Sequence, residues 1–119
     1  MAVAVKRKLS ASTNGKPIKV VATATAGTTI HTAVAGTTDG TYDEIWLYAY
    51  NGHTTAVTLT IEFGGATVPD QNIVITLPSK SGLNLIVPGL ILQNGLVVAA
   101  FASVANVITI SGYVNSITD

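Results

Sequence analysis

The residues able to perform acid–base or metal chemistry are few and scattered along the chain. The two histidines, His31 and His53, lie in no recognised catalytic motif, and the chain has no cysteine. A transition-metal site would then need both histidines together with Asp or Glu, and their spacing gives no support for such a set. We expect both histidines to be exposed or hydrogen-bonded residues near strand ends, and we expect no metal and no cofactor.

The acidic residues offer one adjacent pair, Asp43-Glu44. Neighbouring positions on a strand point to opposite faces, so this pair is poorly placed to act as a glycosidase couple. Asp39-Gly40 lies in a nearby polar loop that lacks the alternating carboxylates of an EF-hand. Phosphate-binding loops, nucleophile elbows and zinc-protease motifs are also missing from the sequence. The sequence therefore predicts a protein that is not an enzyme.

The composition is that of one compact domain with unusually little charge. The 119 residues are 48% hydrophobic and 10% charged, whereas an average soluble domain has about a quarter charged residues. This length suits a single core, and the hydrophobicity excludes a disordered chain. A formal net charge of zero gives no global attraction to nucleic acid or membrane. We expect part of the surface to be covered by partners.

No targeting or membrane-spanning segment is expected. The basic residues follow the short apolar start of the chain, which is the reverse of a signal peptide. The most hydrophobic region, residues 83–102, is interrupted by Pro88-Gly89 and by residues 93–95, which would leave backbone groups unpaired in lipid. These features favour synthesis in the cytoplasm and no membrane partner.

The basic residues are concentrated at the start of the chain. Lys6, Arg7, Lys8 and Lys16 are four of the six Lys and Arg residues. We expect residues 1–16 to form an N-terminal arm and residues 17–119 to form the folded domain. The arm is either a solvated terminus or a segment that orders against a neighbouring subunit or an acidic partner. No aromatic residue is interleaved with its cations, which disfavours direct nucleic-acid binding.

From residue 17 onward, the hydrophobic pattern has a period of two. Apolar and polar residues alternate strictly in residues 57–63, as they do in a half-buried strand. Turn residues at Asn51-Gly52 predict an antiparallel hairpin between 44–50 and 55–63, and Pro88-Gly89 is expected to bound a strand. The sequence predicts an all-β, single-domain antiparallel β-sandwich of about 7–8 short strands, jelly-roll or immunoglobulin-like, with an open small barrel as the competing fold. The other expected strands are 18–25, 29–34, 72–77, 83–87, 96–102 and 107–114.

Two of these strands are apolar on both faces, although a two-layer sandwich buries only one face of each sheet. In residues 44–50, three aliphatic residues alternate with Trp46, Tyr48 and Tyr50, and residues 96–102 are apolar throughout. The second face is covered either by the chain's own loops or, as we prefer, by other subunits, because Trp and Tyr are enriched at interfaces.

Several phrases of the sequence resemble one family of proteins. They are STNGKPIKVVATAT (12–25), TTIHTAV (28–34), DEIWLYA (43–49), LTIEFG (59–64), VPGL (87–90) and NGLVV (94–98). In this layout, over nearly the full chain, the protein resembles the small all-β virion proteins of tailed bacteriophages that decorate or cement the capsid.

The resemblance implies a passive, non-enzymatic function. Such a protein binds the major capsid protein, is often a homotrimer, and stabilises the phage head on the capsid exterior after synthesis in the host cytoplasm. Its N-terminal arm would contact the capsid through Lys6, Arg7 and Lys8, and Trp46, Tyr48 and Tyr50 would contribute capsid or inter-subunit contacts. One alternative is another virion component, such as a head–tail connector, a tail terminator or a fibre-base protein. Another is a carbohydrate-binding or adhesin module, in which the three aromatic residues form a stacking face.

Overall fold

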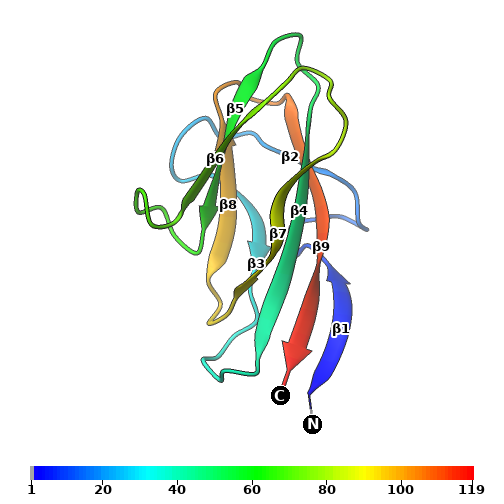
Figure 1. The fold of residues 1–119 in the computed structure, drawn as a ribbon, viewed down its shortest axis with the longest axis vertical. Coiled ribbons are helices and arrows are strands. Elements are labelled where there is room, and N and C mark those ends of the chain that lie inside the picture. The colour runs from blue at the N-terminus through cyan, green and yellow to red at the C-terminus, as the bar shows by residue number, and fades with distance from the viewer. Residues whose placement is uncertain (1) are drawn as a thin grey trace.

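The computed structural model describes residues 2–119, which form nine β-strands and no helix (Figure 1). No helix long and apolar enough to cross a bilayer occurs in this part of the chain. The strands are β1 (Val3–Lys8), β2 (Ile18–Lys19), β3 (Thr28–Thr32), β4 (Tyr42–Asn51), β5 (Val57–Phe63), β6 (Asn72–Leu77), β7 (Asn84–Leu92), β8 (Val97–Ala102) and β9 (Ile108–Thr118).

The strands form two antiparallel sheets. Sheet A has the order β1-β9-β4-β7, and β2 pairs with the same edge of β9 further along that strand. Sheet B has the order β3-β8-β5-β6. The chain thus nests the antiparallel pairs β2–β9, β3–β8, β4–β7 and β5–β6 inside one another, which is the wrapping of a jelly roll. The all-β antiparallel sandwich is confirmed, and the strand order excludes the immunoglobulin-like and open-barrel alternatives.

The hydrophobic core lies between the two sheets and comes from the alternate residues that the period of two predicts. Ile45 and Leu47 of β4 have no exposed surface, and neither do Leu59 and Ile61 of β5 on the opposite sheet. Full burial of one such side chain contributes roughly 1.5–3 kcal/mol to folding. The other buried apolar side chains are Leu9, Val20, Ile30, Ala33, Ala49, Val57, Leu77, Ile86, Val87, Val98, Ala100, Ala102, Ile108, Ile110 and Val114.

The predicted hairpin at Asn51-Gly52 is wrong, because β4 belongs to sheet A and β5 to sheet B. The positive φ angles that a tight hairpin turn needs occur at Asn94 and Gly95 (64° and 66°) but not at Asn51 or Gly52. Asn51 is fully buried, and its Nδ2 donates to the carbonyl oxygen of Leu77 at 2.9 Å. This side chain therefore anchors a crossing between the sheets rather than a turn within one sheet.

The predicted strand at residues 18–25 is shorter than expected, since β2 covers only its first two residues. Thr28 Oγ1 accepts hydrogen bonds of 3.1 Å from the backbone nitrogens of both Val21 and Ala22. The buried carboxylate of Glu62 holds the end of the same loop with a hydrogen bond of 2.7 Å to its backbone. Side-chain acceptors of this kind compete with sheet pairing for the backbone donors.

Pro88-Gly89 does not end a strand, contrary to the expectation from the sequence, but lies inside β7. The register between β4 and β7 shifts beside it, between Ile45 and Trp46. A proline is tolerated here because β7 is an edge strand, where a missing N–H group breaks no necessary bond. Gly89 supplies the positive φ of 79° that the irregular backbone requires.

The first half of the expected arm is an edge strand of sheet A. β1 pairs antiparallel with β9 from Val3↔Thr118 to Lys8↔Tyr113, and all six of its residues are exposed. Figure 1 shows β1 beside the C-terminal half of β9, at an end of the molecule where sheet A extends past β3 and β8. Both sides of β1 are therefore accessible to a partner.

Candidate functional site

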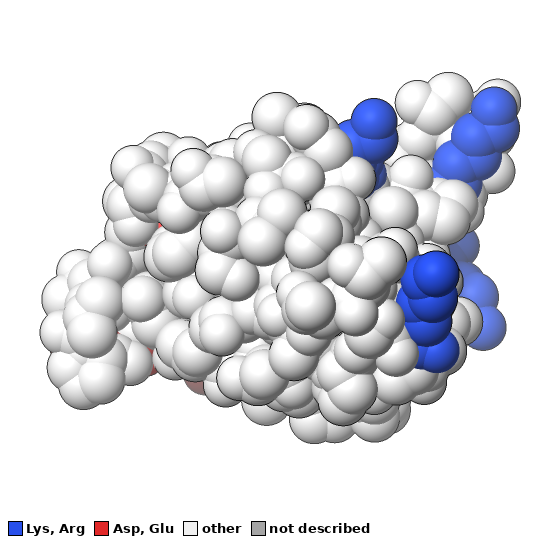
Figure 2. Space-filling view, turned by 90° about the horizontal axis from the view of Figure 1, so that it is seen from above, with Lys and Arg blue, Asp and Glu red and all other residues white. Residues whose placement is uncertain are grey.

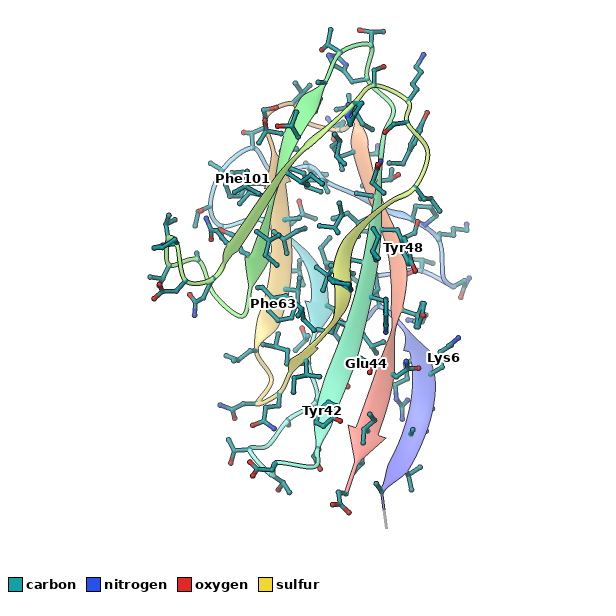
Figure 3. All side chains as sticks on the ribbon, in the orientation of Figure 1. Lys6, Tyr42, Glu44, Tyr48, Phe63 and Phe101 are labelled. Atoms are coloured by element: carbon teal, nitrogen blue, oxygen red, sulfur yellow. The ribbon has the colours of Figure 1, made fainter. Side chains whose placement is uncertain are left out.

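The outer face of sheet A carries a row of large aromatic side chains. Along β4 buried and half-buried residues alternate strictly, and the half-buried set points away from the core. Figure 3 shows Tyr42, Glu44 and Tyr48 following one another along β4, with Lys6 beside them on β1. The predicted site residues Trp46, Tyr48 and Tyr50 all belong to this half-buried set.

Trp46 is held in a fixed position on this face. Its ring stacks with that of Tyr113 on β9, with centroids 6.3 Å apart and planes inclined by 16°. Its Nε1 donates to Glu44 Oε1 at 2.8 Å. A Cβ atom at Gly89 would lie 2.8 Å from the indole Cζ2, so only glycine leaves room for the ring beside β7. The indole and the phenol thus form a preorganised aromatic platform.

Glu44 is the acidic group of the platform, and its hydrogen bonds orient it. Besides the indole N–H, Oε1 accepts a hydrogen bond of 2.9 Å from Asn115 Nδ2 on β9. These two donors, first Trp46 and then Asn115, lower the pKa of Glu44 below its ordinary value because they stabilise the ionised carboxylate. The platform therefore carries a negative charge at neutral pH.

The first cation of the arm lies over this platform. Lys6 Nζ is 4.5 Å from the centroid of the Tyr113 ring, a cation–π arrangement. Lys8 pairs with Tyr113 in the ladder, and alternation places its side chain on the same face. We call the set Lys6, Lys8, Trp46, Tyr48, Tyr50 and Tyr113 the cationic–aromatic face.

Arg7 lies on the opposite side of sheet A. It is paired with the core residue Val114, so it shares the core-facing side of the sheet. There it lines a pocket of about 450 Å³ together with His31 and Asp43. The structure thus places Lys6, Trp46, Tyr48 and Tyr50 on the outer face and Arg7 on the opposite side of the sheet, and Lys8 also borders the pocket beside Arg7.

His31 and Asp43 join the two sheets at this pocket. His31 Nε2 and Asp43 Oδ2 are 2.7 Å apart and both side chains are buried. His31 Nδ1 accepts a hydrogen bond of 3.0 Å from the backbone N–H of Ser10, so the imidazole proton lies on Nε2 and is donated to Asp43. Asp43 Oδ2 also accepts the Val34 N–H at 3.2 Å. Both ring nitrogens are therefore engaged, and the pair links β3 of sheet B to β4 of sheet A.

The other residues considered for chemistry are dispersed. His53 follows the crossing at Asn51, whose Oδ1 accepts the His53 backbone N–H at 2.8 Å. Glu44 faces outward and Asp43 inward, as strand alternation predicts for neighbouring residues. Within residues 2–119, no three His, Asp or Glu side chains gather closely enough to hold a metal ion.

Sequence reasoning missed Tyr113, Asn115 and Glu44 as members of this region. Tyr113 and Asn115 alternate along β9 and lie directly opposite Trp46 and Glu44 in the ladder. A pairing of residues 42–51 with 108–117 would have identified them, but such a pairing is not visible in either segment alone.

Comparison of the chain with protein-family models, with curated proteins and with solved structures finds no match in any of the three.

Proposed function

We propose that the protein is a non-enzymatic structural component of a tailed-bacteriophage virion, a cement or decoration protein that binds the head and bridges capsid subunits. The cationic–aromatic face is the observation that carries this proposal. It offers the stacked Trp46–Tyr113 pair beside Lys6, on a face of sheet A that no other strand of residues 2–119 covers. Aromatic residues that are fixed before binding contribute large contact areas at low entropic cost, which suits adhesion without chemistry.

A bridging protein needs a second contact surface, and the far edge of sheet A offers one. β7 is the opposite edge strand, and Leu85, Leu90 and Ile91 on it are 47%, 43% and 57% exposed. Exposed apolar residues gathered on one edge are a feature of interaction sites. With the cations on one edge and the aliphatic residues on the other, each protein can contact two neighbours.

The charge distribution supports the proposal that the cationic–aromatic face is the one that contacts the capsid. Figure 2 shows the Lys and Arg side chains gathered at the side of the molecule where β1 lies in Figure 1, with little acidic surface between them. We propose that this side faces the major capsid protein on the capsid exterior. The proposed homotrimer would place several such faces on one capsid site, so weak single contacts combine into strong attachment.

The experiment is co-sedimentation of the purified protein with heads assembled from the major capsid protein of the same virus. We expect saturable binding by the wild type and at least ten-fold weaker binding by a Lys6→Ala/Trp46→Ala variant. Val74→Ala, which removes an exposed apolar side chain from β6 in sheet B, is the matched control and should bind normally. Light scattering on a sizing column tests the trimer. Equal binding by the two variants, or no binding by the wild type, contradicts the proposal.

A carbohydrate-binding function is the second candidate, because the same platform has the groups that a sugar needs. Trp46 and Tyr113 provide two nearly parallel aromatic rings on which a sugar could stack, and Glu44 and Asn115 provide polar groups beside them. Binding of the wild type to a glycan array, lost in Trp46→Ala, would favour this candidate. An array without signal, combined with binding to heads, would favour the capsid function.

A further inference from the structure

The pocket beside Arg7 is a second candidate site, distinct from the cationic–aromatic face. It lies where the core-facing side of sheet A continues past sheet B, and residues of β1, β3, β4 and β9 line it. On this side of β1, Val3 and Val5 are 54% and 40% exposed, whereas Ile45 on the same side of β4 is fully buried. The sandwich is therefore open at this end.

The end pocket has exposed cations at its border and a buried carboxylate in its wall. Arg7 and Lys8 lie at its border and are exposed. Asp43 also lines it; this residue is only 4% exposed, and its Oδ1 has no hydrogen-bond partner among residues 2–119. The groups that the pocket offers to a ligand are therefore the exposed cations at its border, which suit an anionic group.

The backbone beside the pocket is also open. β1 pairs with β9 on one side, and no strand among residues 2–119 pairs with it on its other side. An edge strand of this kind is a template for one more strand. Its lysines and arginine disfavour pairing with a second β1, because the like charges would repel each other.

We propose that the open edge of β1 and the end pocket bind an extended, acidic segment of a partner polypeptide, added as a further strand of sheet A. This inference deepens the proposed function and rests on it for the identity of the partner, the capsid polypeptide. A carboxylate of the segment pairs with Arg7.

The side chains of β1 match a peptide better than a compact ligand. Val3, Val5 and Arg7 follow one another at every second position, which is roughly 6.7 Å per step along a strand. They present two apolar contacts and then one cation in a line. An added strand has the same period, so its alternate side chains meet this line in order, the acidic one at Arg7.

Charge complementarity supports an acidic partner over a neutral one. Five of the six Lys and Arg residues (Lys6, Arg7, Lys8, Lys16 and Lys19) lie within the first nineteen positions, and β1 and β2 both lie on this edge of β9. An edge with this charge attracts an acidic segment and increases its rate of association at low ionic strength.

The experiment uses an array of overlapping fifteen-residue peptides that tile the major capsid protein of the same virus. The full-length protein is applied to the array, and the strongest peptide is then titrated in solution by fluorescence anisotropy. We expect one extended acidic segment to bind. Arg7→Ala should weaken the titrated binding at least ten-fold, and replacing the acidic residue of the peptide by its amide should weaken it similarly. Lys19→Ala, which removes the same charge from β2, should change binding less than two-fold.

The outcomes separate this inference from the proposed function. If no peptide binds, or if Arg7→Ala and Lys19→Ala behave alike, the inference is overturned even where whole heads still bind through the cationic–aromatic face. If an acidic peptide binds through Arg7 but heads do not bind, the inference about the edge stands and the cement function fails. Trp46→Ala should leave peptide binding unchanged. A loss of binding in that variant would show that the segment binds the cationic–aromatic face and not the edge of β1, which overturns the inference.

Discussion

The two faces of β4 differ sharply in exposure and in composition. Its inner residues, Asp43, Ile45, Leu47, Ala49 and Asn51, are at most 4% exposed, and its outer residues are all half-buried. The inner set packs against sheet B or bonds across to it. The outer set contains four of the protein's aromatic residues, and no strand of residues 2–119 covers it.

This difference indicates that one strand serves two purposes. The inner face supplies the folding free energy, since the burial of apolar surface is the main force that drives folding. The outer face could be replaced by Thr and Ser without loss of the core, as on many sheets that face solvent. Its large aromatic residues are therefore the part of β4 that the proposed function would use.

The largest effect should come from truncation of the inner face. Leu47→Ala removes a side chain with no exposed surface, and we expect a loss of about 2–5 kcal/mol in the free energy of unfolding. Tyr48→Ala, the adjacent outer residue, should cost less than about 1 kcal/mol but weaken attachment to heads. Urea denaturation of both variants measures the difference. Equal losses at the two positions would show that the outer face also belongs to the core.

A smaller loss is expected from the polar part of the inner face. Asp43→Ala leaves the His31 Nε2 proton and the Val34 N–H without their acceptor, and we expect a loss of about 2 kcal/mol. Asp39→Ala, in the exposed loop before β4, is the control and should be nearly neutral. If Asp43→Ala is also neutral by urea denaturation, the contact between His31 and Asp43 does not hold the sheets together.

The sequence predicted the two faces of β4 well, because burial on one side of a strand leaves a period of two that can be read locally. The strand order could not be predicted in this way, since it depends on which strand edges meet. Asn51 shows the limit, because its dipeptide with Gly52 favours a hairpin. In the fold the chain crosses between the sheets instead, and Asn51 Nδ2 donates to the Leu77 carbonyl, a long-range contact that the dipeptide does not reveal.

The candidate site could be predicted only in part, because alternation along one strand can be read from the sequence whereas pairing between distant strands cannot. Trp46, Tyr48 and Tyr50 could be assigned to one face by alternation alone. Arg7 could not be separated from Lys6 and Lys8, because residues 3–8 lack the alternation of a strand and the pairing of β1 with β9 is a long-range contact. The same holds for Tyr113, which joins the site only across the sheet.

A third experiment tests the platform itself. Gly89→Ala places a Cβ atom 2.8 Å from the Trp46 indole and also strains a backbone with a φ of 79°, so we expect a loss of about 1–2 kcal/mol. Gly95→Ala has the same kind of strain, at a φ of 66°, but its Cβ atom meets no neighbour within 4 Å. Only Gly89→Ala should shift the fluorescence of Trp46, the single tryptophan of the protein. A shift of similar size in both variants would show that the indole is not held by Gly89.

The smallest effect concerns the pH dependence of the free energy of unfolding that Glu44 on the outer face causes. Since hydrogen bonds from Trp46 and Asn115 lower the pKa of Glu44 in the folded protein, its ionisation favours the folded state. This contribution is complete above the pKa of the unfolded chain and is lost as the pH falls through the lower pKa of the folded protein. Glu44→Gln should therefore be less stable than the wild type at neutral pH, and the difference should shrink on acidification. Urea denaturation followed by Trp46 fluorescence at several pH values measures this, with Asp70→Asn on an exposed loop as the control. If the stability difference between the wild type and Glu44→Gln stays constant with pH, the hydrogen bonds from Trp46 and Asn115 do not stabilise the Glu44 carboxylate. The aromatic platform would then not be fixed by this carboxylate.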